Sequence, residues 1–331
     1  MTMSTSHASP DAIVSPDLST EGVDPLKLTP AELKDVLARR DAPAWWRLAG
    51  HLTYLVAFGW LWFAHWCPLP GMEPLSLWIA VPALLLYGIG LATMFAAMHE
   101  CVHRTAFKTN TYNDGVGWFA GLLSFYNSTF YRHYHGWHHR FTQIPGKDPE
   151  LEDRKPTSLI GYVIEISGIT WWIGKIRGHL TLAAGRIANR PYVPENARAE
   201  VIRSVRLQLL TYVLIIGLSV AFQSWWFVLG WLLPLIIGQP FLRVFVLSEH
   251  TGCARDGDRY GNTRTTYTIP LINFLMWEMP FHAEHHRHPA APFHALGRLH
   301  AKMQPHLKYL ANDGYMGVQR GIIKRLGIDP A

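Results

Sequence analysis

The chain has 331 residues, of which 49% are hydrophobic and only 16% are charged. Soluble proteins usually carry charge on about a quarter of their residues, so this composition argues against an ordinary soluble domain and favours a membrane protein. The net charge of +6 comes from basic residues that lie between long uncharged runs, which indicates an anionic membrane surface and not nucleic acid as the partner.

The N-terminal segment 1–28 is polar, rich in Ser, Pro and Asp, and lacks a basic stretch followed by an apolar core. We expect a disordered tail there and not a signal peptide. Thr29 and Glu32 have the spacing of a capping box, with Pro30 in the first turn, so a short amphipathic helix is predicted within 29–44. That helix would lie on the membrane surface; a plain solvated helix is the alternative.

Three runs without Asp, Glu, Lys or Arg predict the spans of a membrane domain that covers residues 45–310. The runs 48–72 and 74–98 each hold the roughly 20 apolar residues of one spanning helix. The run 207–242 has 36 residues, too many for one helix, and predicts a hairpin that turns near Gln223. A large buried helical core is the alternative, and residues 311–331 are expected to form a C-terminal tail. The predicted spans are about 48–68, 76–98, 206–222 and 225–246.

The connectors between these spans predict the orientation in the membrane. The connector 68–76 and the turn near Gln223 contain no Lys or Arg, whereas the segment 99–204 contains 13. Under the positive-inside rule, that segment and both termini face the cytoplasm. The three cysteines are far apart in the sequence, so they predict no disulfide framework and suit a reduced compartment.

Histidines cluster at the cytoplasmic ends of the predicted spans. The second span ends in an HxxxH pair, and two HxxHH triplets follow, one before the third span and one after the fourth. Two such triplets are rarely met by chance, even in a chain with 18 histidines. A further histidine lies just after the fourth span. These residues are His99 and His103, then His135, His138 and His139, then His250, and finally His282, His285 and His286.

The spacing of these histidines suits metal ions. Positions i, i+3 and i+4 share one face of a helix, so each triplet can direct its imidazoles towards one point. Imidazoles grouped at a low-dielectric boundary are costly unless something binds their ring nitrogens. Eight or nine of them exceed the four ligands of one zinc ion, and they match two ions with four or five nitrogen ligands each. The ligand type admits Zn, Cu, Fe and Ni. Two irons can activate O2 between them, and the membrane location points to a hydrophobic substrate.

Other polar residues near the clusters have subsidiary expected roles. Four carboxylates are candidates for orienting the imidazoles, with Asp148 and Glu249 the stronger and Glu100 and Glu284 the weaker; a simple surface charge is the alternative for each. His288 lies next to Pro289 and off the shared spacing, and we expect it behind the ligands or at the surface. The remaining histidines expected to be ordinary polar residues at the membrane interface are His51, His65, His179 and His300.

The three clusters resemble the histidine boxes of the membrane fatty acid desaturase and hydroxylase superfamily. The gap of about thirty residues between the first two clusters is similar. The stretches "HHRFTQIPGKDPE" and "NTRTTYT" further resemble the bacterial branch. The resemblance covers roughly residues 45–300. It implies an all-α integral membrane protein with four transmembrane helices in two hairpins and a cytoplasmic helical cap that holds a non-haem di-iron site.

The resemblance also implies the activity and the ligands. It indicates an O2-dependent oxidoreductase of the bacterial inner membrane that introduces a C=C double bond into a fatty acyl chain or similar lipid. No "HPGG" haem motif and no cysteine cluster occurs in the sequence, so electrons would come from a separate ferredoxin or similar protein and its reductase. Basic residues near the site would steer an acidic donor, with a basic collar that faces the membrane as the equal alternative; they are Arg132, Arg140, Lys147 and Arg255. The ligands implied for the two irons are the nine clustered histidines, His99, His103, His135, His138, His139, His250, His282, His285 and His286.

Two departures and three alternatives qualify the resemblance. Animal acyl-CoA desaturases have an Asn four residues before the additional histidine, where this chain has Val246, and their first box is HxxxxH, which speaks against acyl-CoA specificity. A hydroxylase or ketolase of the same superfamily and a desaturase of a non-lipid small metabolite are alternatives within the enzyme class. A membrane metal-binding or transport protein is the remote alternative, because transport sites lie near the bilayer midplane and these histidines lie outside the predicted spans.

Overall fold

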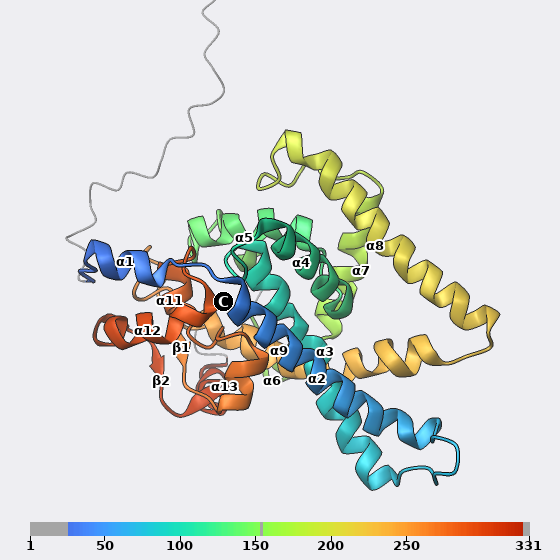
Figure 1. The fold of residues 1–331 in the computed structure, drawn as a ribbon. Helices are drawn as coiled ribbons and strands as arrows, with labels where there is room; N and C mark the ends of the chain where they lie inside the picture. Colours follow the sequence, from blue (N-terminus) through green and yellow to red (C-terminus); the bar gives the residue numbers. More distant parts are fainter. Residues whose placement is uncertain (1–25, 153–154, 327–331) are drawn as a thin grey trace, which may run out of the picture.

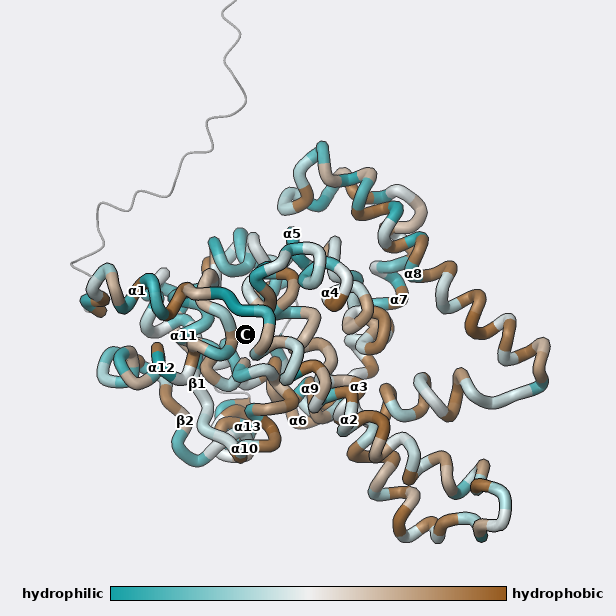
Figure 2. Tube along the Cα trace, in the orientation of Figure 1, coloured by the Kyte–Doolittle hydropathy of each residue, from teal (hydrophilic) through white to brown (hydrophobic). Residues whose placement is uncertain are grey.

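A computed structural model describes residues 26–152 and 155–326 of the chain. Two helical hairpins project from a cap in which most of the remaining elements gather (Figure 1). Hydrophobic residues are frequent along the projecting hairpins, whereas hydrophilic residues gather around α5 and at the start of α8 (Figure 2). The structure confirms the predicted helical membrane architecture with a cap.

The first hairpin consists of α2 (Asp41–Trp66) and α3 (Leu77–Val102), preceded by the short helix α1 (Pro30–Val36). The capping box at the start of α1 forms as predicted, with the Thr29 side chain accepting from the Glu32 backbone. α1 is shorter than the predicted helix 29–44, because the extended backbone of Arg40 separates it from α2. α2 packs closely on α3 at Gly90, where an added Cβ would lie 2.7 Å from the Leu55 side chain.

The second hairpin consists of α8 (Glu195–Ala221), the π-helix η3 (Val228–Leu232) and α9 (Leu233–His250). Gln223 has φ +49°, so the chain turns where the sequence predicts. α9 crosses α3 where two glycines face each other. A Cβ on Gly88 would lie 2.2 Å from the Pro234 carbonyl oxygen, and one on Gly238 would lie 1.9 Å from the Gly88 carbonyl oxygen. Such contacts between small residues let two membrane helices approach closely.

Three of these helices are long and apolar enough to cross a membrane, namely 77–102, 195–221 and 228–250. They overlap the second, third and fourth predicted spans, with ends that differ from the predicted ones. The helices α6 (Leu159–Ile166) and α7 (Ile169–Ala183) would add a fourth if the pair, which is bent by 55°, forms one span. α2 stands where the first span was predicted but is less apolar, since it contains five Trp and two His. Its passage through the membrane stays a prediction.

The cap holds the short elements. A two-stranded parallel sheet pairs β1 (Thr265–Thr266) with β2 (Leu310–Ala311), with Thr265 opposite Leu310. The helical elements of the cap are α4 (Asn110–Ser124), α5 (Ser128–Phe141), η2 (Pro149–Leu151), α10 (Pro270–Leu275), α11 (His282–Arg287), α12 (Phe293–Met303), η4 (Gln304–His306) and α13 (Gly314–Arg325).

The C-terminal segment is part of the fold. In α13, Gln319 donates from Nε2 to the Val244 carbonyl and to Ser248 Oγ, both at 2.8 Å. The Tyr315 ring lies 4.1 Å from the Phe245 ring between centroids. The prediction of a tail from residue 311 is therefore wrong up to residue 326, because apolar positions on one face of α13 bury it against α9. Most of the predicted N-terminal tail, residues 1–25, lies outside the described residues.

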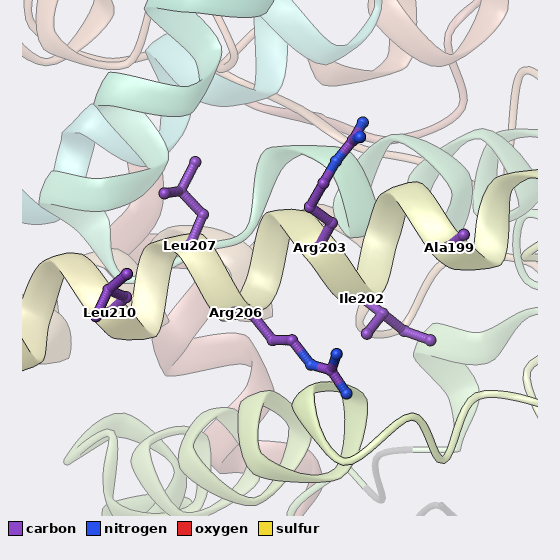
Figure 3. A pocket seen from close by; sticks show the side chains of 6 residues that line it. All are labelled: Ala199, Ile202, Arg203, Arg206, Leu207 and Leu210. Atoms are coloured by element: carbon purple, nitrogen blue, oxygen red, sulfur yellow. The ribbon is translucent and has the colours of Figure 1, made fainter.

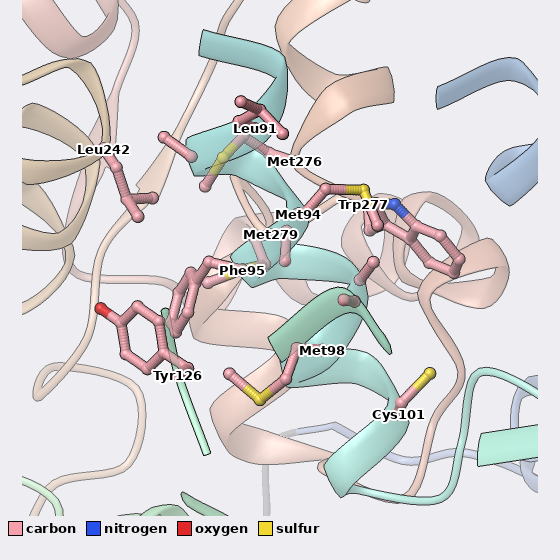
Figure 4. Close-up of a cluster of buried hydrophobic side chains, with 14 of the residues drawn as sticks. Leu91, Met94, Phe95, Met98, Cys101, Tyr126, Leu242, Met276, Trp277 and Met279 are labelled. Atoms are coloured by element: carbon pink, nitrogen blue, oxygen red, sulfur yellow. The ribbon is translucent and has the colours of Figure 1, made fainter. Parts of the chain in front are cut away.

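A buried apolar layer fills the space between α3, α9 and the cap (Figure 4). It is rich in methionine, an unbranched side chain that fills irregular gaps. Phe95 packs in this layer one helical turn before His99, with 6.0 Å between the two ring centroids. The layer therefore separates the histidines from the membrane-facing ends of the hairpins. Its labelled members are Leu91, Met94, Phe95, Met98, Cys101, Tyr126, Leu242, Met276, Trp277 and Met279.

Candidate metal centre

Four helices deliver the predicted ligands to one place. α3 carries His99 and ends with His103 as its C-cap, and α9 ends at His250. The close crossing of α3 and α9 thus brings the first histidine pair near the additional histidine. α5 contributes one HxxHH triplet, and its start is fixed by Asn127, whose side chain caps the Phe130 backbone. α11 is the triplet 282–286 and one further residue.

One ring nitrogen from each of eight histidines belongs to one of two groups, and within each group these nitrogens lie no more than 4.8 Å apart. The two groups adjoin where the rings of His139 and His286 stack with their centroids 4.1 Å apart. In the first group, His139 Nε2 lies 2.9 Å from His135 Nε2 and 3.1 Å from His285 Nε2, so three nitrogens converge on one point. The first group is His99, His103, His135, His139 and His285, and the second is His138, His250 and His286.

His282 borders the second group without belonging to it. Its ring centroid lies 4.5 Å from that of His286 and 5.1 Å from that of His250. The structure thus brings all nine predicted ligands together, eight of them in the two groups. His288 is the C-cap of α11 and lies outside both groups.

Six imidazoles of the cage, as we call these nine histidines, are kept neutral. Burial, and secondarily the neighbouring imidazoles, hold the pKa well below the usual value for His103, His135, His139, His282, His285 and His286. A neutral imidazole offers one nitrogen lone pair to a metal.

Several of these nitrogens have no hydrogen-bond partner among the described residues, which is costly for buried polar atoms. They include both ring nitrogens of His99 and the Nε2 atoms of His103, His250 and His286. The cage therefore fits two transition-metal ions that accept nitrogen ligands.

The cage predicts how the stability of the metal-free protein depends on pH. Below a pH of about 6.5, the usual value for histidine, the unfolded chain binds protons at these residues and the native cage does not. The free energy of unfolding should therefore fall on acidification, by up to about 1.4 kcal/mol per pH unit for each such histidine. The measurement is the thermal unfolding midpoint in neutral detergent at pH 7.5, 6.5 and 5.5. A midpoint that rises on acidification would contradict the neutral cage.

Asp148 orients one imidazole of the cage. Its Oδ1 lies 2.8 Å from His138 Nδ1, and its Oδ2 accepts from the Gln143 backbone at 2.7 Å. Burial raises the pKa of Asp148, but the bond from His138 and the backbone bonds outweigh burial and lower it, so the group is a carboxylate that can only accept. Burial lowers the pKa of His138, but the nearby Glu150 and Asp148 carboxylates outweigh burial and raise this pKa overall. Donation from Nδ1 leaves His138 Nε2 as the nitrogen that is free to bind a metal.

Two glutamates considered from the sequence also lie against cage imidazoles. Glu100 Oε1 is 3.5 Å from His99 Nδ1 and 3.9 Å from His285 Nδ1. Glu249 Oε2 is 3.5 Å from His282 Nε2. Glu100, predicted as a weaker candidate, therefore lies as close to a cage imidazole as Glu249 does.

Glu284 has a different environment, because its side chain binds residues behind the triplet of α11. It accepts from Thr265 Oγ1 and His300 Nδ1, each at 2.5 Å. His300 in turn contacts the Tyr267 hydroxyl through Nε2 at 2.8 Å. His300, expected to be an interfacial polar residue, thus helps to fix the helix that carries His282, His285 and His286. The other three such histidines bind backbone carbonyls, His51 that of Gly90, His65 that of Leu75 and His179 that of Lys175.

Three residues at the cage were missed in the sequence. Glu150 Oε2 lies 3.6 Å from His138 Nε2, and the turn η2 brings it there. The Tyr131 ring stacks on the His135 ring with centroids 4.9 Å apart, and Thr142 Oγ1 lies 3.1 Å from His286 Nδ1. Tyr131 precedes His135 by four residues, so on a helix the two share one face, and this contact could have been predicted from the sequence. The contacts of Glu150 and Thr142 depend on tertiary structure and could not.

Comparison with known proteins finds relatives of the chain. The family model for fatty acid desaturase matches residues 75–316. An sn-1 oleoyl-lipid 12-desaturase of Picosynechococcus sp. is 28% identical over 188 residues, which cover 53% of this chain and 51% of the relative. The corresponding enzyme of Synechocystis sp. is 24% identical over 253 residues, with 69% of each chain covered. A sphingolipid delta(4)-desaturase of Arabidopsis thaliana is 28% identical over 233 residues, with 68% of this chain and 61% of the relative covered. The chain thus spans about half the length of the Picosynechococcus relative.

Proposed function

The chain belongs to the fatty acid desaturase family, and from this membership we propose that it introduces a carbon–carbon double bond into the acyl chain of a membrane lipid, using O2 and two iron ions. The observation that carries the proposal is the convergence of five and three imidazoles in adjoining groups at the ends of α3 and α9. A transport site would be expected near the bilayer midplane, within the spans. The position of the histidines at the ends of α3 and α9 therefore favours an enzyme.

The cage would hold the irons, and the rest of the chain would position the substrate. Iron bound there would supply the activation of O2 that breaking an unactivated C–H bond requires. In the overall reaction, two adjacent CH2 groups lose two hydrogens, and O2 takes these together with two electrons and two protons to form two waters. The first iron would be held by His99, His103, His135, His139 and His285, and the second by His138, His250 and His286 with His282.

An apolar pocket of about 380 Å³ between the hairpins supports an acyl chain as substrate. Leu91 lines the pocket and also belongs to the buried layer beneath the cage. It precedes His99 by eight residues on α3, which is about 12 Å along the helix. An acyl chain in the pocket would therefore lead towards the cage from the bilayer. The pocket is lined by Phe63, Tyr87, Leu91, Leu122, Leu123, Tyr212, Ile215, Trp226, Phe227, Gly230 and Trp231.

The pocket stays apolar because the polar ends of its aromatic residues bind backbone carbonyls. Tyr87 donates from its hydroxyl to Gly230 at 2.8 Å, and Trp231 donates from Nε1 to Leu123 at 2.8 Å. Gly230 lies in the π-helix η3, a kind of turn that is often found at functional sites. These bonds satisfy the polar atoms and leave ring faces for contact with a hydrocarbon chain.

Filling the pocket tests the assignment of the acyl chain. Ile215 lines the pocket and is 40% exposed, whereas its neighbour Ile216 is 41% exposed and does not line it. Ile215→Trp should lower the conversion of long acyl chains relative to short ones by roughly tenfold, because a small change of volume in an apolar pocket is worth at least about that factor. Ile216→Trp is the matched control and should leave the ratio unchanged. An unchanged ratio in Ile215→Trp would exclude the pocket as the chain site.

The separate electron donor remains part of the proposal. Arg132, one of the basic residues expected to steer it, is paired with Asp114 at 2.5 Å. Arg140 and Lys147 are exposed beside the Phe141 ring, within 5.4 Å of its centroid, and are better placed for a contact with an acidic protein. We propose the cytoplasmic side for this surface from the positive-inside rule.

The full chain in host membranes, supplied with a reduced ferredoxin and O2, tests the proposed function directly. We expect an acyl chain with one additional double bond, no product without O2, and two electrons consumed for each double bond. Analysis of total lipid chains by mass spectrometry gives the product. A hydroxylated chain in its place would assign the protein to the hydroxylases, and zinc that exchanges freely with no O2 consumption would exclude the oxidase chemistry.

A further inference from the structure

We propose that the outer face of α8 binds an anionic phospholipid at the membrane interface. The site is an open groove of about 540 Å³ that is separate from the histidine cage. Four of its lining side chains are apolar and two are arginines. They are Ala199, Ile202, Arg203, Arg206, Leu207 and Leu210.

The groove lies where α8 changes from charged to apolar. All charged residues of α8 lie between Glu195 and Arg206, and the fifteen residues 207–221 carry none. Because 195–221 is one of the candidate spans, the change marks the depth of the lipid headgroups. Phosphates of the cytoplasmic leaflet would lie at Arg203 and Arg206, and acyl chains would run along Leu207 and Leu210.

The two faces of α8 have different partners. The inner face is buried, and its Ser204 and Gln208 accept hydrogen bonds from Asn127 Nδ2 at 3.1 and 3.0 Å. Asn127 caps α5, the helix that carries the first histidine triplet, His135, His138 and His139. The groove residues repeat at intervals of three and four on the opposite face, where five of the six are exposed and Ile202 is partly buried. The lipid would therefore lie across α8 from the start of α5.

The charge of the groove is uncompensated. No described carboxylate forms an ion pair with Arg203 or Arg206, and the carboxylate of Glu195 lies instead near Arg198, at 3.9 Å. Arg206 donates from Nε to the Ala183 carbonyl at 2.8 Å, which fixes the side chain at the end of α7 on one side of the groove. Figure 3 shows the two guanidinium groups on either side of the helix axis, with Leu207 and Leu210 further along it. Two planar donors one helical turn apart suit the oxygens of a phosphate.

Lipid retention by the full-length protein in neutral detergent tests the site without need of iron or turnover. The probes are phosphatidylglycerol and phosphatidylcholine with identical acyl chains, titrated onto delipidated protein and counted by native mass spectrometry. The wild type should retain phosphatidylglycerol preferentially. The variant R203Q/R206Q should bind it roughly 25-fold more weakly, from about fivefold for each basic residue near a lipid surface. Arg198→Gln removes one charge from the same helix outside the groove and should bind as the wild type.

Three results of the lipid titration would overturn the proposal. They are equal retention of the two lipids, undiminished binding of phosphatidylglycerol by R203Q/R206Q, and binding of inorganic phosphate alone as tightly as the lipid. A stable dimer through α8 in detergent would overturn it as well, because a second copy would then cover the groove. If R203Q/R206Q does not fold, R203K/R206K replaces it, and this variant should bind more weakly than the wild type because lysine lacks the planar fork.

Discussion

Substitution of His285 by Ala is expected to abolish product formation and to reduce bound iron from about two per chain. His285 belongs to the first nitrogen group, where its Nε2 lies 3.1 Å from His139 Nε2, and its Nδ1 lies 3.9 Å from Glu100. Removal takes away one of five imidazoles and leaves the Glu100 carboxylate with one partner fewer. Loss of residues that merely orient ligands costs about 10–100-fold in affinity or activity, so loss of a ligand should cost at least the upper figure.

The measurement for His285→Ala is iron content together with the unsaturated product in host membranes. His306→Ala is the matched control, because His306 is a partly exposed histidine of the same cap outside both groups. It should keep both iron and activity. An active His285→Ala variant with two irons would refute the assignment of this residue, whereas an inactive variant with unchanged iron would move its role from the metal to the substrate.

The architecture of the cage could be predicted to the extent that it follows helical periodicity. His135, His138 and His139 lie on one face of α5 because i, i+3 and i+4 always do so, and the same holds for the triplet of α11. The turn near Gln223 was also readable, since a run of uncharged residues twice the length of a span must fold back. Helical periodicity therefore predicted which histidines share a helix face. The predicted topology placed the ends of those helices on the same side of the membrane.

The remaining features depend on contacts that no local pattern encodes. The division of the histidines into five and three, with His282 beside them, depends on how α3, α5, α9 and α11 meet, and the close crossing of α3 and α9 at Gly88 and Gly238 is one part of that arrangement. Glu150 reaches His138 only because η2 turns the loop, and α13 is held by bonds from Gln319 to α9. A short amphipathic segment at the end of a chain looks like a tail until its partner surface is known.

Replacing Asp148 by Asn should weaken one metal site selectively. The carboxylate accepts from His138 Nδ1 at 2.8 Å and so fixes which nitrogen of that imidazole is free. An amide can present a donor there, which disfavours the required tautomer, and we expect a loss of about 10–100-fold in iron affinity or activity. Because His138 belongs to the second group, the titration of iron against a chelator should become biphasic, with one ion held as in the wild type.

Asp258→Asn, which removes a carboxylate paired with Lys308 at 2.6 Å, is the control and should titrate as the wild type. Equal weakening of both irons in Asp148→Asn would show that the two groups do not act as separate sites, and no weakening would show that Asp148 serves only its loop.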